Sequence, residues 1–162
     1  MAKETVTNAM RLLKKEGIVF DVVRYESSGT AGEHFGEKIA EKTGIPPEKS
    51  FKTLVAHGKN DYYVACVPVN REMNLKKLAS LAGEKKIELV GVRDLLKVAG
   101  YERGSVSPLG MKKKYRTFID KSALNFDKIA VSGGQMGITL VLSPTELIKI
   151  VNAEAEDITG EA

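Results

Sequence analysis

Side chains able to act as nucleophiles or metal ligands are few in this sequence. It contains one cysteine, Cys66, and two histidines, His34 and His57, which are too few for a histidine-rich metal site. Cys66 lies in an apolar run that favours a buried core role, and His57 alternates with Val55 along a β-rich run that favours a structural one. Neither a Gly-x-Ser-x-Gly elbow nor a Walker loop occurs. We therefore expect no nucleophilic triad, no metal and no cofactor.

A lysine interrupts the apolar run at positions 51–55. Lys52 and Thr53 lie there among phenylalanine, leucine and valine. Successive side chains of a strand point to opposite faces. Lys52 therefore faces either a cleft, where its ammonium group could meet a substrate, or an exposed strand edge, where lysine is common. The residues alone leave both possibilities open.

Two glycine-rich segments could bind an anion or a developing oxyanion. Segment 100–110 contains three glycines, one proline and two serines, and segment 132–137 contains three more glycines between two β-rich runs. Glycine adopts positive φ without steric cost, so neighbouring N–H groups can point together at an anion. Ordinary turn chemistry is the alternative, and it is favoured for 132–137 taken alone. The candidate residues in these segments are Gly100, Gly104, Ser105, Ser107, Pro108, Ser132, Gly133 and Gly134.

A basic cluster follows the first glycine-rich segment. Lys112, Lys113, Lys114 and Arg116 lie within five residues, whereas the net charge of the whole chain is only +4. Such a cluster can contact phosphates, with an attraction that salt weakens. A solvated loop is the ordinary alternative. We take the four residues as candidate contacts to the phosphates of a nucleic acid.

Hydrophobic periodicity predicts the elements that must position these residues. Expected helices cover 5–16, 33–43, 75–82 and 93–99, and a last helix starts after Ser143 as N-cap with Pro144 at its first position. Expected strands cover 20–25, 51–57, 62–69, 87–90, 116–120, 128–131 and 138–142, with a hairpin turn at 58–61.

These elements predict one domain over residues 1–162. The fold class is α/β, with a mixed, strongly bent, barrel-like sheet of about six to seven strands surrounded by helices. No apolar run approaches the roughly 18–20 residues that span a bilayer, and no export signal precedes the first helix. A single cysteine suits a reducing compartment, so we expect no membrane association and a cytoplasmic location.

A series of different short motifs extends over nearly the whole chain. They are Tyr25, His34-Phe35-Gly36, Phe51-Lys52-Thr53-Leu54, Val67-Pro68, Asn74-Leu75-Lys76-Lys77, Gly100-Tyr101, Ser107-Pro108-Leu109-Gly110 with Lys112-Lys113, Phe118-Ile119-Asp120 and Val131-Ser132-Gly133-Gly134. In this order they resemble the YbaK/EbsC family of aminoacyl-tRNA deacylases, related to the editing domain inserted in bacterial prolyl-tRNA synthetases.

The resemblance implies a trans-editing deacylase that removes cysteine misattached to proline tRNA. Proline and cysteine are close in size, so a synthetase pocket rejects cysteine poorly and a second site must destroy the mistake. The cysteinyl thiol would attack its own carbonyl, so the protein needs a shaped pocket and oxyanion donors. Mischarged tRNA is the implied partner, and a prolyl-tRNA synthetase is the second one considered. Two alternatives stay open: deacylation of alanyl- or seryl-tRNA by water, and a non-catalytic tRNA-binding module.

The resemblance also implies roles for individual residues. The catalytic set is Lys52, Gly100, Gly104 and Ser105, and the substrate-binding set is Tyr25, Phe35, Thr53, Ser107, Pro108, Ser132, Gly133, Gly134 and Thr139. Two positions depart from the cysteine-specific pattern. Ser105 stands where a second glycine is familiar, and Thr139 stands where an aspartate often holds the substrate's α-ammonium group.

Overall fold

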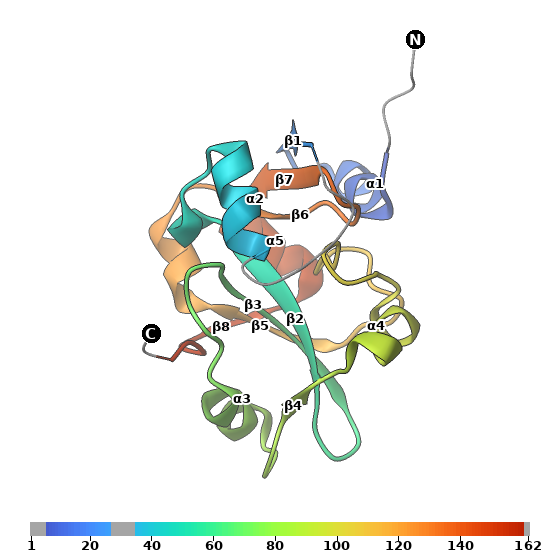
Figure 1. Ribbon diagram of the computed structural model, residues 1–162, viewed down its shortest axis with the longest axis vertical. Helices are drawn as coiled ribbons and strands as arrows, with labels where there is room; N and C mark the ends of the chain where they lie inside the picture. Colours follow the sequence, from blue (N-terminus) through green and yellow to red (C-terminus); the bar gives the residue numbers. More distant parts are fainter. Residues whose placement is uncertain (1–5, 27–34, 161–162) are drawn as a thin grey trace.

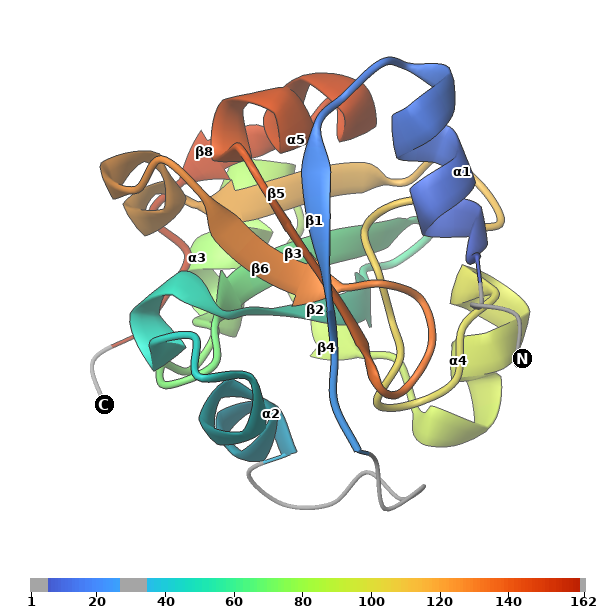
Figure 2. The ribbon, with the colours of Figure 1, turned by 90° about the horizontal axis from the view of Figure 1, so that it is seen from above.

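The computed structural model describes residues 6–26 and 35–160, which contain five α-helices and eight strands in two sheets (Figures 1 and 2). The helices are α1 (Asn8–Lys15), α2 (Phe35–Thr43), α3 (Leu75–Ala82), α4 (Val92–Ala99) and α5 (Pro144–Val151), with 3-10 turns η1 (Pro47–Lys49) and η2 (Lys121–Asn125). The strands are β1 (Phe20–Arg24), β2 (Phe51–His57), β3 (Tyr62–Pro68), β4 (Glu88–Leu89), β5 (Arg116–Asp120), β6 (Ile129–Ser132), β7 (Ile138–Leu142) and β8 (Glu154–Glu156).

The two sheets meet near the start of β2. One sheet has the order β1-β7-β6 and the other has the order β4-β2-β3-β5-β8, with β3–β5 and β5–β8 parallel and the remaining pairs antiparallel. A parallel bridge between Ser50 and Ala130 links them. Figure 1 shows the three-stranded sheet at one end of the molecule and the long β2–β3 hairpin reaching the other end.

Three clusters of buried apolar side chains hold the helices against the sheets. The largest lies between the sheets, α1 and α5 and includes Leu13, Leu140 and Leu147. A second lies under α3, and a third fixes α4 through contacts among Val55, Val98 and Val106. The glycine-rich segment after α4 is therefore attached to the same core as β2.

Local signals explain where the helices begin and end. The Asn74 side chain accepts the Lys77 N–H at 3.0 Å before α3, and Gly83 ends that helix with φ of +75°. The predicted Ser143 N-cap is confirmed, because its hydroxyl accepts the Glu146 N–H. No helix within 6–26 and 35–160 is long and apolar enough to cross a bilayer.

The sheet differs from the prediction in two ways. One bent sheet of six to seven strands was expected, whereas the described residues form eight strands in two sheets and no closed barrel. The unpredicted strand is β8, whose Glu-Ala-Glu sequence has no strand-like apolar pattern. It forms because Arg116 pairs with Glu154 and the buried Asp120 carboxylate accepts the Ile158 N–H, which fixes the tail beside β5.

Candidate functional site

A cavity of about 520 Å³ lies at the junction of the two sheets. Its walls come from β2, α2, the β4–α4 junction, the segment after α4 and strands β6 and β7. Seven of the predicted site residues line it: Tyr25, Phe35, Lys52, Thr53, Gly104, Ser132 and Thr139. The other predicted residues of the glycine-rich segments, Gly100, Ser105, Ser107, Pro108, Gly133 and Gly134, are not among the described residues that line it.

The edge of β2 supplies the charged wall of the cavity. β2 pairs with β3 along its whole length but with β4 only at Ala56 and His57. Lys52 therefore lies where the second edge of the strand is open toward the cavity. Its side chain is half-buried and has no hydrogen bond or ion pair to any described residue. A partly enclosed ammonium group without a partner attracts anionic or oxygen-rich ligands more strongly than one in open water.

One face of α2 forms the opposite wall. Phe35, Ile39 and Thr43 are four residues apart and all line the cavity. A Cβ atom at Gly36 would lie 2.7 Å from Val69 Cγ1, so a glycine there lets the helix approach the β3–α3 connection. His34, which precedes this helix in the motif, lies outside the described residues.

The segment after α4 presents the Gly104 backbone to the cavity, while its serine hydroxyls bond within the loop. Gly104 lines the cavity with φ of +90°, a conformation that side chains rarely adopt. The Ser105 hydroxyl donates to the Glu102 carbonyl at 3.0 Å, and the buried Ser107 hydroxyl accepts the Leu109 N–H at 3.2 Å. Both serines therefore build the loop, and the departure from glycine at position 105 adds a hydroxyl that is already bonded.

Ser132 joins the two glycine-rich segments. Its hydroxyl donates to the Ser105 carbonyl at 3.0 Å and accepts the Gly134 N–H at 3.1 Å. Gly134 has φ of +93° and passes so close to Tyr101 that a Cβ atom would lie 3.0 Å from its ring. The turn after β6 thus holds the Gly104 loop in place, a role that the sequence motif alone did not indicate.

Tyr25 and Thr139 close the end of the cavity formed by the three-stranded sheet. The Tyr25 N–H donates to the Gly137 carbonyl at 3.0 Å, and burial raises the pKa of its phenol, which favours the neutral hydroxyl. Thr139 pairs with Val23 and Ser132 across the sheet and is nearly buried. The cavity therefore carries a threonine hydroxyl where the family resemblance leads one to expect a carboxylate.

Cys66 lies in the hydrophobic core, next to the β2 wall of the cavity. It is 1% exposed, and burial raises the pKa of its thiol to about 12. Its sulfur lies 3.8 Å from the Thr53 hydroxyl. The predicted core role of Cys66 is confirmed.

The predicted basic cluster is divided in the structure. Lys112, Lys113 and Lys114 are exposed. Arg116 instead binds both carboxylate oxygens of Glu154, at 2.7 and 2.9 Å, and lies over the Phe118 ring. Its guanidinium group is therefore occupied within the protein, whereas the three lysines extend into solvent.

Three charged residues of the cavity lining were not predicted individually. They are Arg103, Glu37 and Glu72. Arg103 is adjacent to Gly104 within the glycine-rich segment 100–110, so the sequence offered a reason to include it in the site. The two glutamates carry no pattern that distinguishes them from other exposed acids. Within the described residues, no three His, Cys, Asp or Glu side chains gather as metal ligands would.

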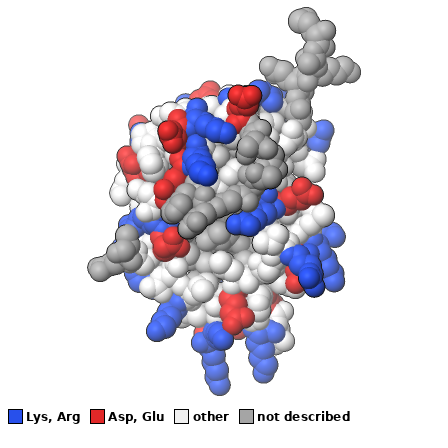
Figure 3. Space-filling view, viewed as in Figure 1, with Lys and Arg blue, Asp and Glu red and all other residues white. Residues whose placement is uncertain are grey.

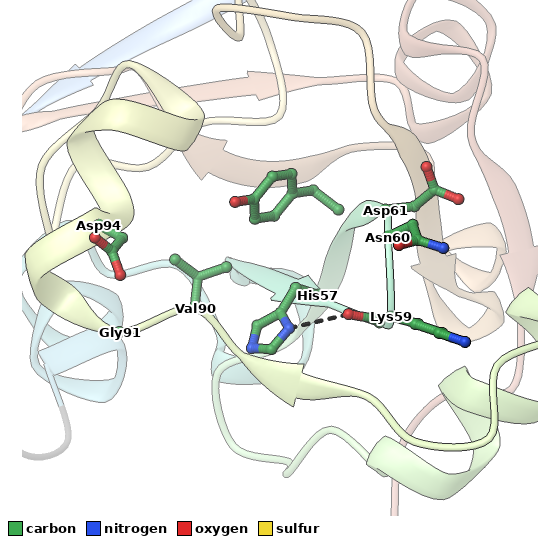
Figure 4. A pocket seen from close by; sticks show the side chains of 9 residues that line it. His57, Lys59, Asn60, Asp61, Val90, Gly91 and Asp94 are labelled. Carbon is green, nitrogen blue, oxygen red and sulfur yellow. Dashed lines mark hydrogen bonds between the residues drawn. The ribbon is translucent and has the colours of Figure 1, made fainter.

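A smaller cavity of about 250 Å³ lies between the tip of the β2–β3 hairpin and the start of α4 (Figure 4). His57, Lys59, Asp61, Val90 and Asp94 are among its lining residues. The two cavities share Val90, so the β4–α4 junction separates them.

Comparison with known proteins identifies relatives of this architecture. Residues 33–150 match the family model described as the aminoacyl-tRNA editing domain. The chain is 37% identical over 154 residues to an Enterococcus faecalis protein named as a candidate Cys-tRNA(Pro)/Cys-tRNA(Cys) deacylase, EbsC, and the match covers 94% of this chain and 93% of that protein.

Two further relatives are more distant. The multifunctional Ser/Thr-tRNA deacylase ProXp-y of Escherichia coli is 26% identical over 161 residues, which cover 95% of this chain and 93% of that protein. A crystal structure described as that of a candidate trans-editing enzyme for prolyl tRNA synthetase superposes with a TM-score of 0.83 at 20% identity, over 97% of this chain and all of that one. At that identity the superposition shows a shared fold. The family match and the Enterococcus relative establish more: this chain belongs to the aminoacyl-tRNA editing domain family.

Proposed function

We propose that this protein removes cysteine misattached to proline tRNA, with the ester held in the 520 Å³ cavity. Family membership makes the chain an aminoacyl-tRNA deacylase, which cleaves the ester between an amino acid and the terminal ribose. The observation that carries the assignment is Lys52, whose ammonium group has no partner among residues 6–26 and 35–160 and lies in the wall of a cavity that the Gly104 backbone also lines. The name of the Enterococcus relative supports cysteine as the amino acid.

The side chains around the cavity fit a reaction in which the substrate supplies its own nucleophile. The Ser132 hydroxyl is held by two hydrogen bonds, the Thr53 hydroxyl lies against Cys66, and the phenol of Tyr25 is neutral. In the proposed step the cysteinyl sulfur bonds to the carbonyl carbon and the ester C–O bond breaks. The thiol proton ends on the departing ribose oxygen, which yields intact tRNA and a thiolactone that water later opens.

The protein contributes position and charge to this step. A cavity that holds the thiol against the carbonyl converts the attack into a favourable intramolecular reaction. Lys52 and the Gly104 N–H would stabilise the negative charge that develops on the carbonyl oxygen, whereas the Ser105 N–H is already bonded to the Glu102 carbonyl. Each such donor typically contributes on the order of 10²-fold to the rate.

A substrate panel tests the function and a thiol analogue tests the mechanism. We expect catalytic release of amino acid from cysteinyl-tRNA(Pro), and much slower release from prolyl-tRNA(Pro). Cysteinyl-tRNA methylated on sulfur keeps the ester and the α-ammonium group, gains one methyl group and cannot cyclise, so it should bind and remain acylated. Rapid deacylation of the methylated substrate would refute the cyclisation, and no turnover of any mischarged tRNA would refute the editing function.

A second candidate substrate is a seryl or alanyl ester attacked by water. Thr139 favours this alternative, because it places a neutral hydroxyl where the family resemblance predicts a carboxylate. The name of the Escherichia coli relative, a Ser/Thr-tRNA deacylase, also favours it. The same panel distinguishes the two candidates. Faster turnover of seryl- or alanyl-tRNA than of cysteinyl-tRNA would assign the water reaction.

Mischarged tRNA is the proposed partner, and the reaction belongs in the cytoplasm, where aminoacyl-tRNA is made and used. A prolyl-tRNA synthetase is the second proposed partner, since it would present freshly mischarged proline tRNA to the cavity. The description of the superposed structure supports this pairing only through the shared fold. Co-purification of the two proteins with tRNA, and a rise in selectivity for proline tRNA when the synthetase is added, would test it.

A further inference from the structure

Exposed apolar side chains gather beside the mouth of the large cavity. Seven large apolar side chains are exposed in the described part of the chain, and four of them lie on the hairpin, β4 and α4. These four are Tyr62 (41% exposed), Leu89 (49%), Val92 (60%) and Leu96 (53%). Leu89 and Val92 also line the large cavity, so this part of the patch is continuous with the site, whereas Tyr62 lines the smaller cavity. Clustered exposed apolar residues are typical of a surface that binds another molecule.

The outer face of α4 combines apolar and basic side chains. Leu95 and Val98 turn inward, the latter into the cluster that contains Val55. Val92 and Leu96 are one turn apart on the exposed side, next to the cavity, and Arg93 and Lys97 form a parallel exposed pair further out. Neither the Arg93 guanidinium nor the Lys97 ammonium group has a hydrogen bond or ion pair among the described residues.

The basic surface continues past the end of α4. The Lys112 N–H donates to the Ala99 carbonyl at 3.1 Å, which places the exposed residues 112–114 beside the end of the helix. Figure 3 shows Lys and Arg side chains on the flank of the molecule that carries α4. Asp94 is the acid on this helix, and it lines the smaller cavity on the other side.

We propose that the outer face of α4 binds the unpaired 3′ end of the tRNA whose terminal ester enters the cavity. This inference rests on the proposed function, because the ester is joined to the last nucleotide and the preceding nucleotides must leave through the cavity mouth. Single-stranded nucleic acid binds where cations follow the phosphates and bases pack against side chains, most often aromatic ones; here aliphatic side chains would take that place. Val92 and Leu96 lie under the bases, and Arg93 and Lys97 lie beside the phosphates. The eight residues of α4 span about 12 Å, enough for roughly three stacked nucleotides at about 3.4 Å each.

Two RNA hairpins with the same acceptor stem test the inference. One ends in the unpaired 3′ nucleotides of tRNA and the other is blunt, and binding is measured by fluorescence anisotropy over a range of salt concentrations. The wild-type protein should prefer the extended hairpin. Leu96→Ser, and the double variant Arg93→Gln/Lys97→Gln, should each lower that preference by about fivefold or more. The double variant should also reduce the salt slope by about 0.7 for each cation removed.

Matched controls lie on another side of the molecule, where η2 and α5 are found (Figure 2). Leu124 is 51% exposed on η2, and Lys149 is exposed on α5. Leu124→Ser and Lys149→Gln should bind both hairpins as the wild type does. Circular dichroism should show the same helix content for all variants.

Three results would overturn the inference. The first is an unchanged preference for the extended hairpin in the α4 variants. The second is an equal loss of affinity for both hairpins, which indicates general phosphate binding. The third is unchanged RNA binding together with lost binding of prolyl-tRNA synthetase, which makes the patch a protein interface. The proposed function fails separately, through absent deacylation by a protein that still prefers the extended RNA.

Discussion

The two cavities beside the β4–α4 junction share Val90 but differ in the state of their polar groups. In the smaller one, His57 Nδ1 lies 3.2 Å from the Gly58 carbonyl, and Nε2 lies 4.0 Å from Glu88, which in turn binds Lys86 at 2.8 Å. In the larger one, the Lys52 ammonium group has no partner among the described residues.

The comparison indicates which cavity is built for a ligand. The charged side chains that line the smaller cavity, Lys59, Asp61 and Asp94, are exposed to solvent, so that cavity follows from the shape of a turn. Holding a cation in a partly enclosed place without a partner costs free energy, since water is displaced and nothing replaces it. That cost is offset when a ligand supplies the missing negative charge. The size of the larger cavity and the partial burial of its lysine therefore point to the same site.

The largest expected effect comes from removing the unpaired charge. Lys52→Ala should lower single-turnover deacylation of saturating cysteinyl-tRNA(Pro) on the order of 10²-fold, about the effect of losing one preorganised donor. Lys52→Arg should rescue poorly, because a planar guanidinium does not replace a compact ammonium in a tight site.

Lys59 provides the matched control in the smaller cavity. The Lys59→Ala variant should deacylate cysteinyl-tRNA(Pro) at the wild-type rate. A wild-type rate in folded Lys52→Ala would remove the distinction between the two cavities, and equal losses in both variants would assign the effect to general charge.

A smaller effect is expected from Ser132, which holds the Gly104 loop through the Ser105 carbonyl. Ser132→Ala should lower kcat/KM about tenfold and destabilise the fold by about 1 kcal/mol, the typical contribution of a hydrogen bond. Ser122→Ala is the comparison, since its buried hydroxyl has no partner among the described residues. The melting temperature and kcat/KM of the two variants should differ. Equal values for both variants would show that Ser132 does not position the loop.

Cys66 should matter for packing and not for chemistry. Cys66→Ala should keep wild-type deacylation and lose about 1 kcal/mol of stability through a small core void. Because burial raises the thiol pKa to about 12, the thiolate fraction is negligible at pH 8 and grows only as pH approaches that value. Native protein should therefore resist alkylation at pH 8 and react once denatured. Rapid alkylation of the folded protein, accompanied by inactivation, would restore an enzyme nucleophile.

The smallest effect is expected at His57. His57→Ala should leave deacylation within about twofold of wild type, because among the described residues the imidazole contacts the Gly58 carbonyl of its own hairpin and Glu88 of β4. A much larger loss of deacylation by the folded variant would mean that the smaller cavity takes part in the reaction.

Much of the fold could be predicted because its signals are local. The β2–β3 hairpin, the Asn74 cap of α3 and the Ser143 cap of α5 each depend on neighbouring residues, and the structure confirms them. The strand β8 could not be predicted, because Glu154–Glu156 pairs with β5 only after the chain has folded around it. The division into two sheets likewise depends on a bridge between Ser50 and Ala130, which are far apart in sequence.

For the site, the residue types are evident from the sequence: Lys52 in an apolar run, glycines able to take positive φ, and a cysteine in another apolar run. Their order along the chain indicated the family. Which of them meet depends on the fold, which places Gly104 in the cavity and bonds the Ser105 and Ser107 hydroxyls within their own loop. It also joined Arg116 to Glu154 and left the α4 face exposed. The physical reason is that side-chain type is a local property, whereas burial and pairing are set by contacts between distant segments.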